Sequence, residues 1–175
     1  NNKILFAKIL ISSLPVIIVG FFLVKTDLIN IIRNIEVIAW TTIIFGILLY
    51  FSDKFKIKKD LTNNFTFKSV IFIGLFQVLS LIPGVSRSGV AITAARFLNY
   101  NRVDSAKISF FLSIPILGAV SFFGLKNTFT ASDIFFTQAN IATILLSFIF
   151  SLITIKFFLN YLKKFSLSVF VYYRI

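Results

Sequence analysis

The stretch Leu81-Ile82-Pro83-Gly84-Val85-Ser86-Arg87-Ser88-Gly89 is a polar break inside otherwise apolar sequence. Its proline and two glycines predict the end of one helix, a tight turn and the start of another helix. The Ser-Arg-Ser run therefore falls at or before a helix N-terminus, where unpaired backbone N–H groups and the helix dipole favour an anion. Two hydroxyls and a guanidinium add donors that suit phosphate oxygens. The stretch predicts a phosphate-binding turn at membrane depth.

The composition is typical of a helical membrane protein. Of the 175 residues, 58% are hydrophobic and 14% are charged, and the mean hydropathy is +0.95. Soluble domains average about 25% charged residues. The chain has no cysteine, which excludes disulfides and zinc sites of the Cys/His type. Its net charge of +12 is spread over the ends of apolar segments and forms no stripe, so nucleic acid is not an expected partner.

We predict an all-α polytopic bundle that forms a single transmembrane domain over residues 1–175 and is surrounded by membrane lipid. Four runs approach the roughly 20 apolar residues that cross a bilayer. They cover residues 4–24, 35–51, 103–125 and 138–162, and a last helix starts at 167–175. Residues 65–98 hold two apolar segments, each too short to cross, on either side of the polar turn. They predict a re-entrant helix-turn-helix hairpin, which is tolerated where it lines a cavity enclosed by protein.

The charge distribution agrees with a hairpin that returns to its own side of the membrane. With that topology, the side that carries the 52–64 linker has a net charge of +10 and the opposite side has a net charge of zero. Cytoplasmic loops are enriched in Lys and Arg, so the linker side is predicted to be cytoplasmic. Arg96, near the returning end of the hairpin, is interpreted as one of these topology determinants, with a side chain that reaches the interface.

These residues also resemble a known family. Three parts of the chain carry the resemblance to the undecaprenyl-diphosphate phosphatases, membrane phosphatases of the bacitracin-resistance type. They are Gln77 through Gly89, the run Ser113-Ile114-Pro115 in a long helix, and the chain end with Tyr173-Arg174. The family signature Pro-Gly-x-Ser-Arg-Ser-x-x-Thr matches this chain at each position that it specifies from Pro83 to Ser88.

The resemblance implies an enzyme that hydrolyses undecaprenyl diphosphate to undecaprenyl phosphate and phosphate. That reaction recycles the lipid carrier of bacterial wall synthesis at the inner (plasma) membrane. It implies catalytic roles for Ser86 and Arg87, and substrate-binding roles for Gly84, Ser88 and Gln77. It further implies an isoprenoid diphosphate lipid as substrate, a homodimer as an oligomeric form, and Mg²⁺ or Ca²⁺ held by glutamates of an earlier repeat.

Two parts of the family pattern are missing from this sequence. A second signature, rich in Glu and ending in Ser-Ser-Thr-Gly-His, has no counterpart, because the chain has no histidine and its only glutamate is Glu36. The signature threonine falls at Ala91, and Thr93 lies about 200° further round a helix, so no threonine role is carried over. We therefore expect a fragment that is the second half of an inverted repeat, lacks the N-terminal repeat, and is inactive alone.

The residues by themselves leave alternatives open. Arg87 has no acidic neighbour in sequence, so at membrane depth its partner is a ligand anion or a glutamate of the missing repeat. The alternative is an arginine whose side chain reaches the interface or caps helix carbonyls. Ser86 and Ser88 are also ordinary helix caps, and Gln77 is also a residue that bonds neighbouring helices. A transporter or flippase for an anionic lipid head group is an alternative function, since broken helices around an anion site are typical of transporters. An inactive truncated product is another.

We expect residues 54–59 and Lys163-Lys164 to be cytoplasmic and residues 126–137 to be periplasmic, because of the charge difference between the two sides. The test places single cysteines, Lys56→Cys and Asn127→Cys, and treats intact cells with a membrane-impermeant thiol reagent. The expected result is labelling at position 127 alone. Labelling at position 56 alone would invert the topology and remove the charge argument for the hairpin.

Overall fold

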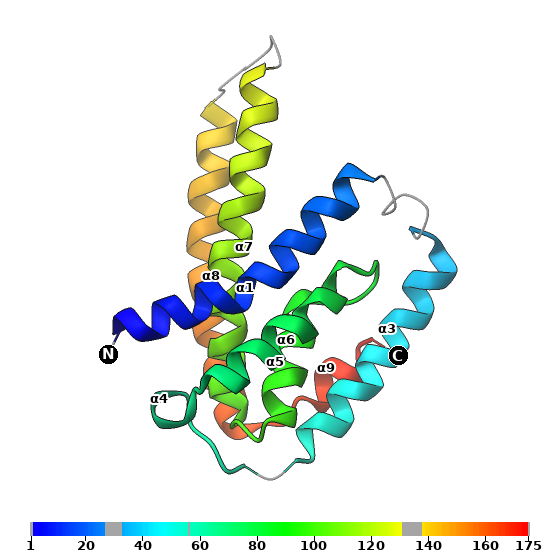
Figure 1. Cartoon of the computed structure of the whole chain (residues 1–175), viewed down its shortest axis with the longest axis vertical. Coiled ribbons are helices and arrows are strands. Elements are labelled where there is room, and N and C mark those ends of the chain that lie inside the picture. The colour runs from blue at the N-terminus through cyan, green and yellow to red at the C-terminus, as the bar shows by residue number, and fades with distance from the viewer. Residues whose placement is uncertain (1, 27–32, 56, 131–137, 175) are drawn as a thin grey trace.

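In the computed structural model, residues 2–26, 33–55, 57–130 and 138–174 are described, and the regular elements within them are helices (Figure 1). The predicted all-α bundle is confirmed. The helices are α1 Asn2–Lys25, α3 Ile35–Asp53, α4 Leu61–Asn64, α5 Phe67–Val78, a 3₁₀ turn at Leu79–Leu81, α6 Arg87–Phe97, α7 Arg102–Thr130, α8 Gln138–Lys164 and α9 Ser168–Tyr172.

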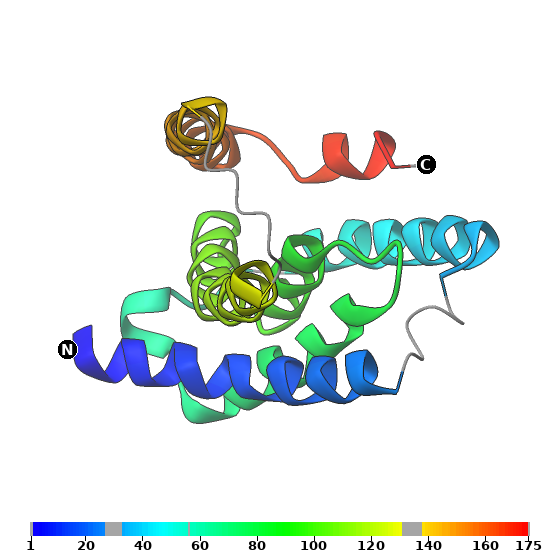
Figure 2. The ribbon, with the colours of Figure 1, turned by 90° about the horizontal axis from the view of Figure 1, so that it is seen from above.

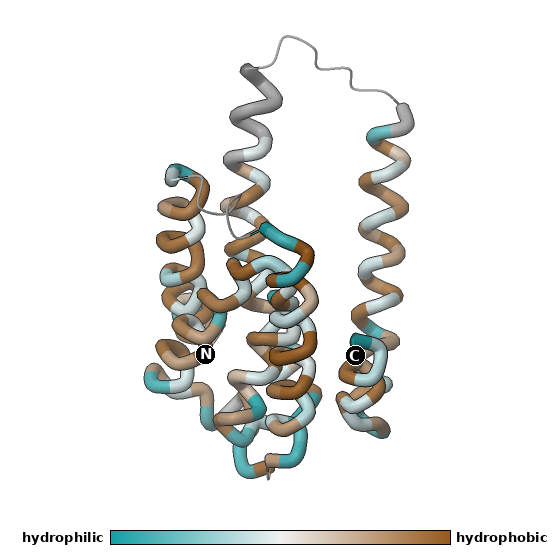
Figure 3. Tube along the Cα trace, turned by 90° about the vertical axis from the view of Figure 1, so that its right-hand side faces the viewer, coloured by the Kyte–Doolittle hydropathy of each residue, from teal (hydrophilic) through white to brown (hydrophobic). Residues whose placement is uncertain are grey.

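Four helices in the described part of the chain are long and apolar enough to cross a membrane. They cover Lys3–Lys25, Ile35–Asp53, Arg102–Phe122 and Asn140–Lys164. Figure 3 shows apolar residues along these helices and polar residues in the loops at their lower ends. Most of the described side chains of α8 are exposed although the helix is apolar. Lipid tails are the surroundings in which such a surface is stable, so the chain is a membrane protein.

The hairpin formed by α5 and α6 lies at the centre of the bundle. Residues 89–96 of α6 are all buried, and α6 packs against α3, α5 and α7 (Figures 1 and 2). On the other side of α5, α1 approaches so closely that a Cβ on Gly74 would stand 2.4 Å from the Ser12 carbonyl oxygen. Small residues allow membrane helices to pack closely in this way.

The turn of the hairpin packs against α3 partway along that helix. Thr41 donates a hydrogen bond to the Pro83 carbonyl oxygen at 2.7 Å, and Thr42 donates to the Gly84 carbonyl oxygen at 3.2 Å. Thr41 precedes Asp53, the last residue of α3, by twelve positions. At 1.5 Å per residue, the turn lies about 18 Å from that end of α3, short of the helix's other end.

The hairpin ends beside the linker from which it starts. The backbone N–H groups of Lys58 and Lys59 donate to the Asn99 carbonyl oxygen at 3.0 and 3.1 Å. Tyr100 donates from its hydroxyl to the Asn64 carbonyl oxygen at 2.7 Å, and burial raises the pKa of that hydroxyl, which keeps it a donor. The chain therefore enters and leaves the bundle at one end, which is the geometry predicted for a re-entrant hairpin. The division into a single domain stays a prediction.

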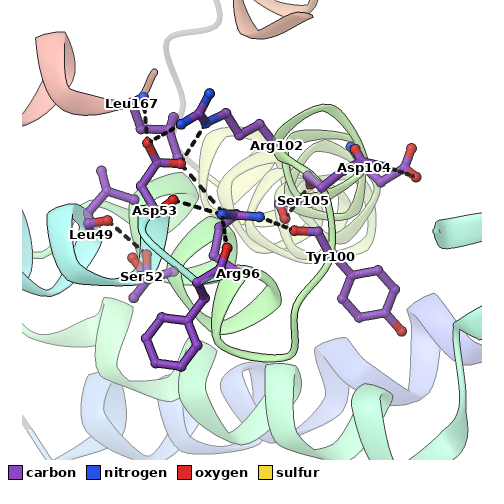
Figure 4. A network of polar contacts seen from close by, with 12 residues as sticks. Leu49, Ser52, Asp53, Arg96, Tyr100, Arg102, Asp104, Ser105 and Leu167 are labelled. Atoms are coloured by element: carbon purple, nitrogen blue, oxygen red, sulfur yellow. Dashed lines mark hydrogen bonds and ion pairs between the residues drawn. The ribbon is translucent and has the colours of Figure 1, made fainter. Parts of the chain in front are cut away.

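A buried charge cluster joins this end of the hairpin to the other helices (Figure 4). Asp53, at the end of α3, is 8% exposed and accepts two hydrogen bonds from Arg102 of α7, at 2.7 and 2.9 Å. The same carboxylate accepts a hydrogen bond at 3.1 Å from the backbone N–H of Leu167, just before α9. Arg96 of α6 lies 3.5 Å from it. One carboxylate thus connects α3, α6, α7 and the segment that leads into α9.

The interpretation of Arg96 as a side chain that reaches the interface is wrong. Arg96 is 1% exposed, and its guanidinium donates to the carbonyl oxygens of Asp53 and Phe55 at 2.8 Å and to that of Tyr100. A guanidinium carries five donors in fixed directions, so three converging carbonyls and a carboxylate stabilise it inside the protein. Asp53 and Arg96 are far apart in sequence, and the residues around each of them do not indicate that the two side chains form an ion pair.

We expect Arg96→Lys to lower the free energy of unfolding by about 1.5 to 3 kcal/mol, because a lysine ammonium cannot reach the same carbonyls from one planar group. Thermal unfolding of the detergent-solubilised full-length protein measures the change. Lys107→Gln is the control. The Lys107 side chain is 44% exposed in its 3.3 Å ion pair with Asp104, so the loss of that pair should cost less than about 1 kcal/mol. Equal stability of Arg96→Lys and the unchanged protein would contradict the role of the cluster.

Candidate functional site

The N-terminus of α6 has the local structure that the sequence predicts. Ser86 is the N-cap residue, with extended backbone, and its Oγ accepts a hydrogen bond from the Gly89 N–H at 3.2 Å. Ser88 Oγ lies 3.3 Å from Ser86 Oγ. The cap starts the helix at Arg87, and the dipole of α6 leaves partial positive charge at this end. Two hydroxyls and a guanidinium therefore surround a helix end that already favours an anion.

An open cavity of about 390 Å³ lies against this helix end. It is lined by residues of the hairpin and of α7, namely Ser80, Val85, Arg87, Ser88, Ser109, Phe110 and Ser113. Ser109 donates to the Ser88 carbonyl oxygen at 3.3 Å, which joins α7 to the first turn of α6. The lining thus combines four hydroxyls with one guanidinium and contains no carboxylate, so its chemistry suits a phosphate group.

Three of the five predicted site residues lie together at this cavity. Arg87 and Ser88 line it, and Ser86 stands beside them as the cap. The Arg87 side chain is exposed, and no hydrogen bond or ion pair joins its guanidinium to any other residue in the described part of the chain. Arg87 is therefore available to a ligand, which agrees with the prediction that it binds an anion.

Gly84 and Gln77, the other two predicted residues, are outside the cavity lining. Gly84 has φ +87°, and a Cβ there would stand 2.4 Å from Thr41 Oγ1 and 2.6 Å from the Ile38 carbonyl oxygen. This glycine therefore allows the turn to pack on α3. Gln77 is 1% exposed, and its Oε1 has no hydrogen-bond partner among the described residues. The substrate-binding roles of both residues stay predictions.

The signature threonine has no substitute in this chain. Thr93 is 1% exposed and donates to the Gly89 carbonyl oxygen at 2.8 Å, inside its own helix. Ala91, at the position of the signature threonine, is fully buried in the apolar core. Neither residue lines the cavity, in agreement with the angular argument from the sequence.

Ser80, Ser109 and Ser113 line the cavity but were not predicted as site residues, although Ser113 belongs to a run that carries the family resemblance. Ser105, Ser109 and Ser113 recur every four residues in α7, a spacing that places them on one face of the helix. That spacing was a usable signal for a polar face. The spacing does not show which helix this polar face of α7 contacts, because the contact with α6 depends on the tertiary fold.

A divalent cation does not fit this cavity. Mg²⁺ and Ca²⁺ take oxygen ligands that include carboxylates, whereas the cavity offers hydroxyls beside a positive guanidinium. Within the described residues, no group of three or more His, Cys, Asp or Glu side chains is arranged to hold a metal. The arrangement can bind an anion and stabilise negative charge that develops on it.

A known protein family is similar to this chain over its whole length. The family described as bacitracin resistance protein BacA matches residues 1–175. The chain belongs to this family. The family resemblance predicted from the turn and the chain end is therefore confirmed.

Curated proteins from several bacteria are similar to this chain. The undecaprenyl-diphosphatase of Pelagibacter ubique (strain HTCC1062) is 49% identical over 100% of this chain and 68% of its own length. The undecaprenyl-diphosphatases of Elusimicrobium minutum (strain Pei191) and Jannaschia sp. (strain CCS1) are 42% and 35% identical, over 100% and 95% of this chain and 65% and 62% of their own lengths. The chain thus spans about two thirds of the length of these relatives.

Proposed function

We propose that the protein that contains this chain hydrolyses undecaprenyl diphosphate to undecaprenyl phosphate and phosphate, and so recycles the lipid carrier of wall synthesis. The observation that carries the proposal is the cavity at the start of α6, where the Arg87 guanidinium and the hydroxyls of Ser80 and Ser88 offer donors to a phosphate group, while the hydroxyls of Ser109 and Ser113 already donate to backbone carbonyl oxygens. The names of the curated relatives support the same substrate. Its proposed location is the bacterial plasma membrane, and a homodimer stays a prediction.

Arg87 is the residue that we expect to stabilise the transition state. Phosphoryl transfer depends mainly on positioning and on the neutralisation of charge on the transferred group. An exposed guanidinium without an internal partner can form a two-pronged contact with phosphate oxygens. The partial positive charge at the end of α6 adds to the same field.

Ser86 suits the role of a hydrogen-bond donor to the substrate. Its oxygen already accepts from the Gly89 N–H, and its hydroxyl hydrogen can turn toward Ser88 or toward a phosphate oxygen. A nucleophilic role would in addition require a base within hydrogen-bond reach. The described lining of the cavity contains no such group.

The base is proposed to lie outside this cavity lining, together with carboxylate ligands for Mg²⁺ or Ca²⁺. Two carboxylates of the described chain are held elsewhere: Asp53 binds Arg102, and Asp104 binds Lys107 and Asn101. Asp53 ends α3 and Asp104 lies in the first turn of α7, both at the linker end of the bundle, whereas Arg87 starts α6 at the turn. The described lining of the cavity would then supply anion binding to a reaction whose base is not part of that lining.

In the full-length protein we expect Arg87→Lys to lower kcat/KM for a long-chain prenyl diphosphate by about 100-fold, because lysine keeps the charge but loses the planar pair of donors. The rate of phosphate release by the detergent-solubilised enzyme measures kcat/KM of the variant and of the unchanged protein. Arg33→Lys is the matched control, since Arg33 is exposed and lies before α3. Equal losses in both variants would contradict phosphate recognition by Arg87. Substrate binding without phosphate release by the unchanged protein would favour a transporter.

Residues 1–175 expressed alone are expected to bind prenyl diphosphate but to release no phosphate, because donors without a base leave the nucleophile unactivated. Phosphate release from the purified chain, with and without Mg²⁺ or Ca²⁺, measures this against a full-length relative. Co-expression with the N-terminal part of such a relative serves as the positive control. Metal-dependent turnover by the chain alone, at the rate of the full-length enzyme, would place the missing base within these residues.

A further inference from the structure

A second cavity, of about 280 Å³, adjoins the first at the start of α6. The two cavities share Ser88 and Phe110 in their linings. The second is mostly apolar, with walls that include Leu49 of α3, Ile92 of α6 and Phe158 of α8. A polar cavity and an apolar cavity therefore meet at Ser88 and Phe110.

Arg174, which follows α9, is the charged residue of the apolar cavity. Its side chain is partly buried, and in the described part of the chain no hydrogen bond or ion pair joins its guanidinium to another residue. Its Nη1 lies 3.0 Å from the point that a Cβ on Gly89 would occupy, and Ser86 Oγ lies 3.3 Å from that point. Because residue 89 is a glycine, the guanidinium can approach the first turn of α6.

An arginine in apolar surroundings requires a partner for its charge. This fold provides partners where arginines are structural, since Arg96 and Arg102 both lie against the Asp53 carboxylate. Among the residues that the structure describes, it provides none for Arg174 or Arg87. The two guanidinium groups lie at the same helix end, beside the two cavities that share Ser88, so a ligand with negative charge at two positions would supply a partner for each.

We propose that Arg174 binds the phosphate that stays on the lipid, while Arg87 binds the phosphate that leaves. The assignment rests on the function proposed above. The apolar cavity beside Arg174 suits the first part of a prenyl chain, and the phosphate nearest to that chain is the one retained after hydrolysis. The hydroxyl-lined cavity beside Arg87 is open and polar, as a site that releases inorganic phosphate requires. Arg174 therefore recognises both the lipid diphosphate and its lipid monophosphate product.

Direct binding to the purified full-length protein tests this, with prenyl monophosphate and inorganic phosphate as the two probes. Arg174→Gln should weaken prenyl monophosphate binding roughly tenfold or more, the effect of losing charge-assisted hydrogen bonds, and leave inorganic phosphate within about twofold. Arg87→Gln should show the opposite pattern. Arg33→Gln, at an exposed position, should change neither.

The opposite patterns separate ligand binding from a folding defect, because a misfolded variant would lose both ligands. Equal weakening of both probes in Arg174→Gln, or no weakening of prenyl monophosphate, would overturn the proposal. Phosphate release by the unchanged protein is measured separately. If the binding patterns hold and no phosphate is released, the proposed hydrolysis fails while the assignment of the two arginines stands.

Discussion

The carboxylate of Asp53 is the constraint on which the site depends. It accepts hydrogen bonds from Arg102 and from the Leu167 N–H, and it balances the charge of Arg96. Arg96 lies one residue before the end of α6. Because a helix is stiff, fixing Arg96 also fixes the position of Arg87, about 14 Å away along the axis. Removing one partner of such a buried cluster leaves an uncompensated charge, which costs several kcal/mol.

Helix α3 supports the hairpin at two levels. Asp53 holds its open end, and Thr41 holds its turn through the Pro83 carbonyl oxygen. Gly84 allows the second contact, since any Cβ would overlap Thr41 and Ile38. A helix end that is fixed in this way presents its donors without reorganisation, which is the condition for electrostatic stabilisation of a transition state.

The sequence predicts what is local. Continuous apolar runs indicate the four long helices, and Pro83 to Ser88 indicate the turn, the cap and the anion-binding arginine. Contacts between distant segments were not predictable. Arg96 contacts Asp53, and Ser109 contacts Ser88, but the sequence around each residue predicts its helix without indicating the partner. Arg96 was misread for this reason, because an arginine at a helix end has the same local pattern whether it faces water or a buried carboxylate.

The arginines of this chain differ in what the fold offers them. Arg96 and Arg102 have a carboxylate and backbone carbonyls at the linker end, and these contacts stabilise the bundle. For Arg87 and Arg174 the described residues offer no such partner, although both lie beside cavities at the start of α6. A ligand that met paired arginines would first have to break ion pairs, which would weaken its binding. Arg87 and Arg174 form no ion pair with the described residues, so an anionic ligand does not compete with a carboxylate of the protein for them. Binding of that anion also stabilises the folded chain by linkage.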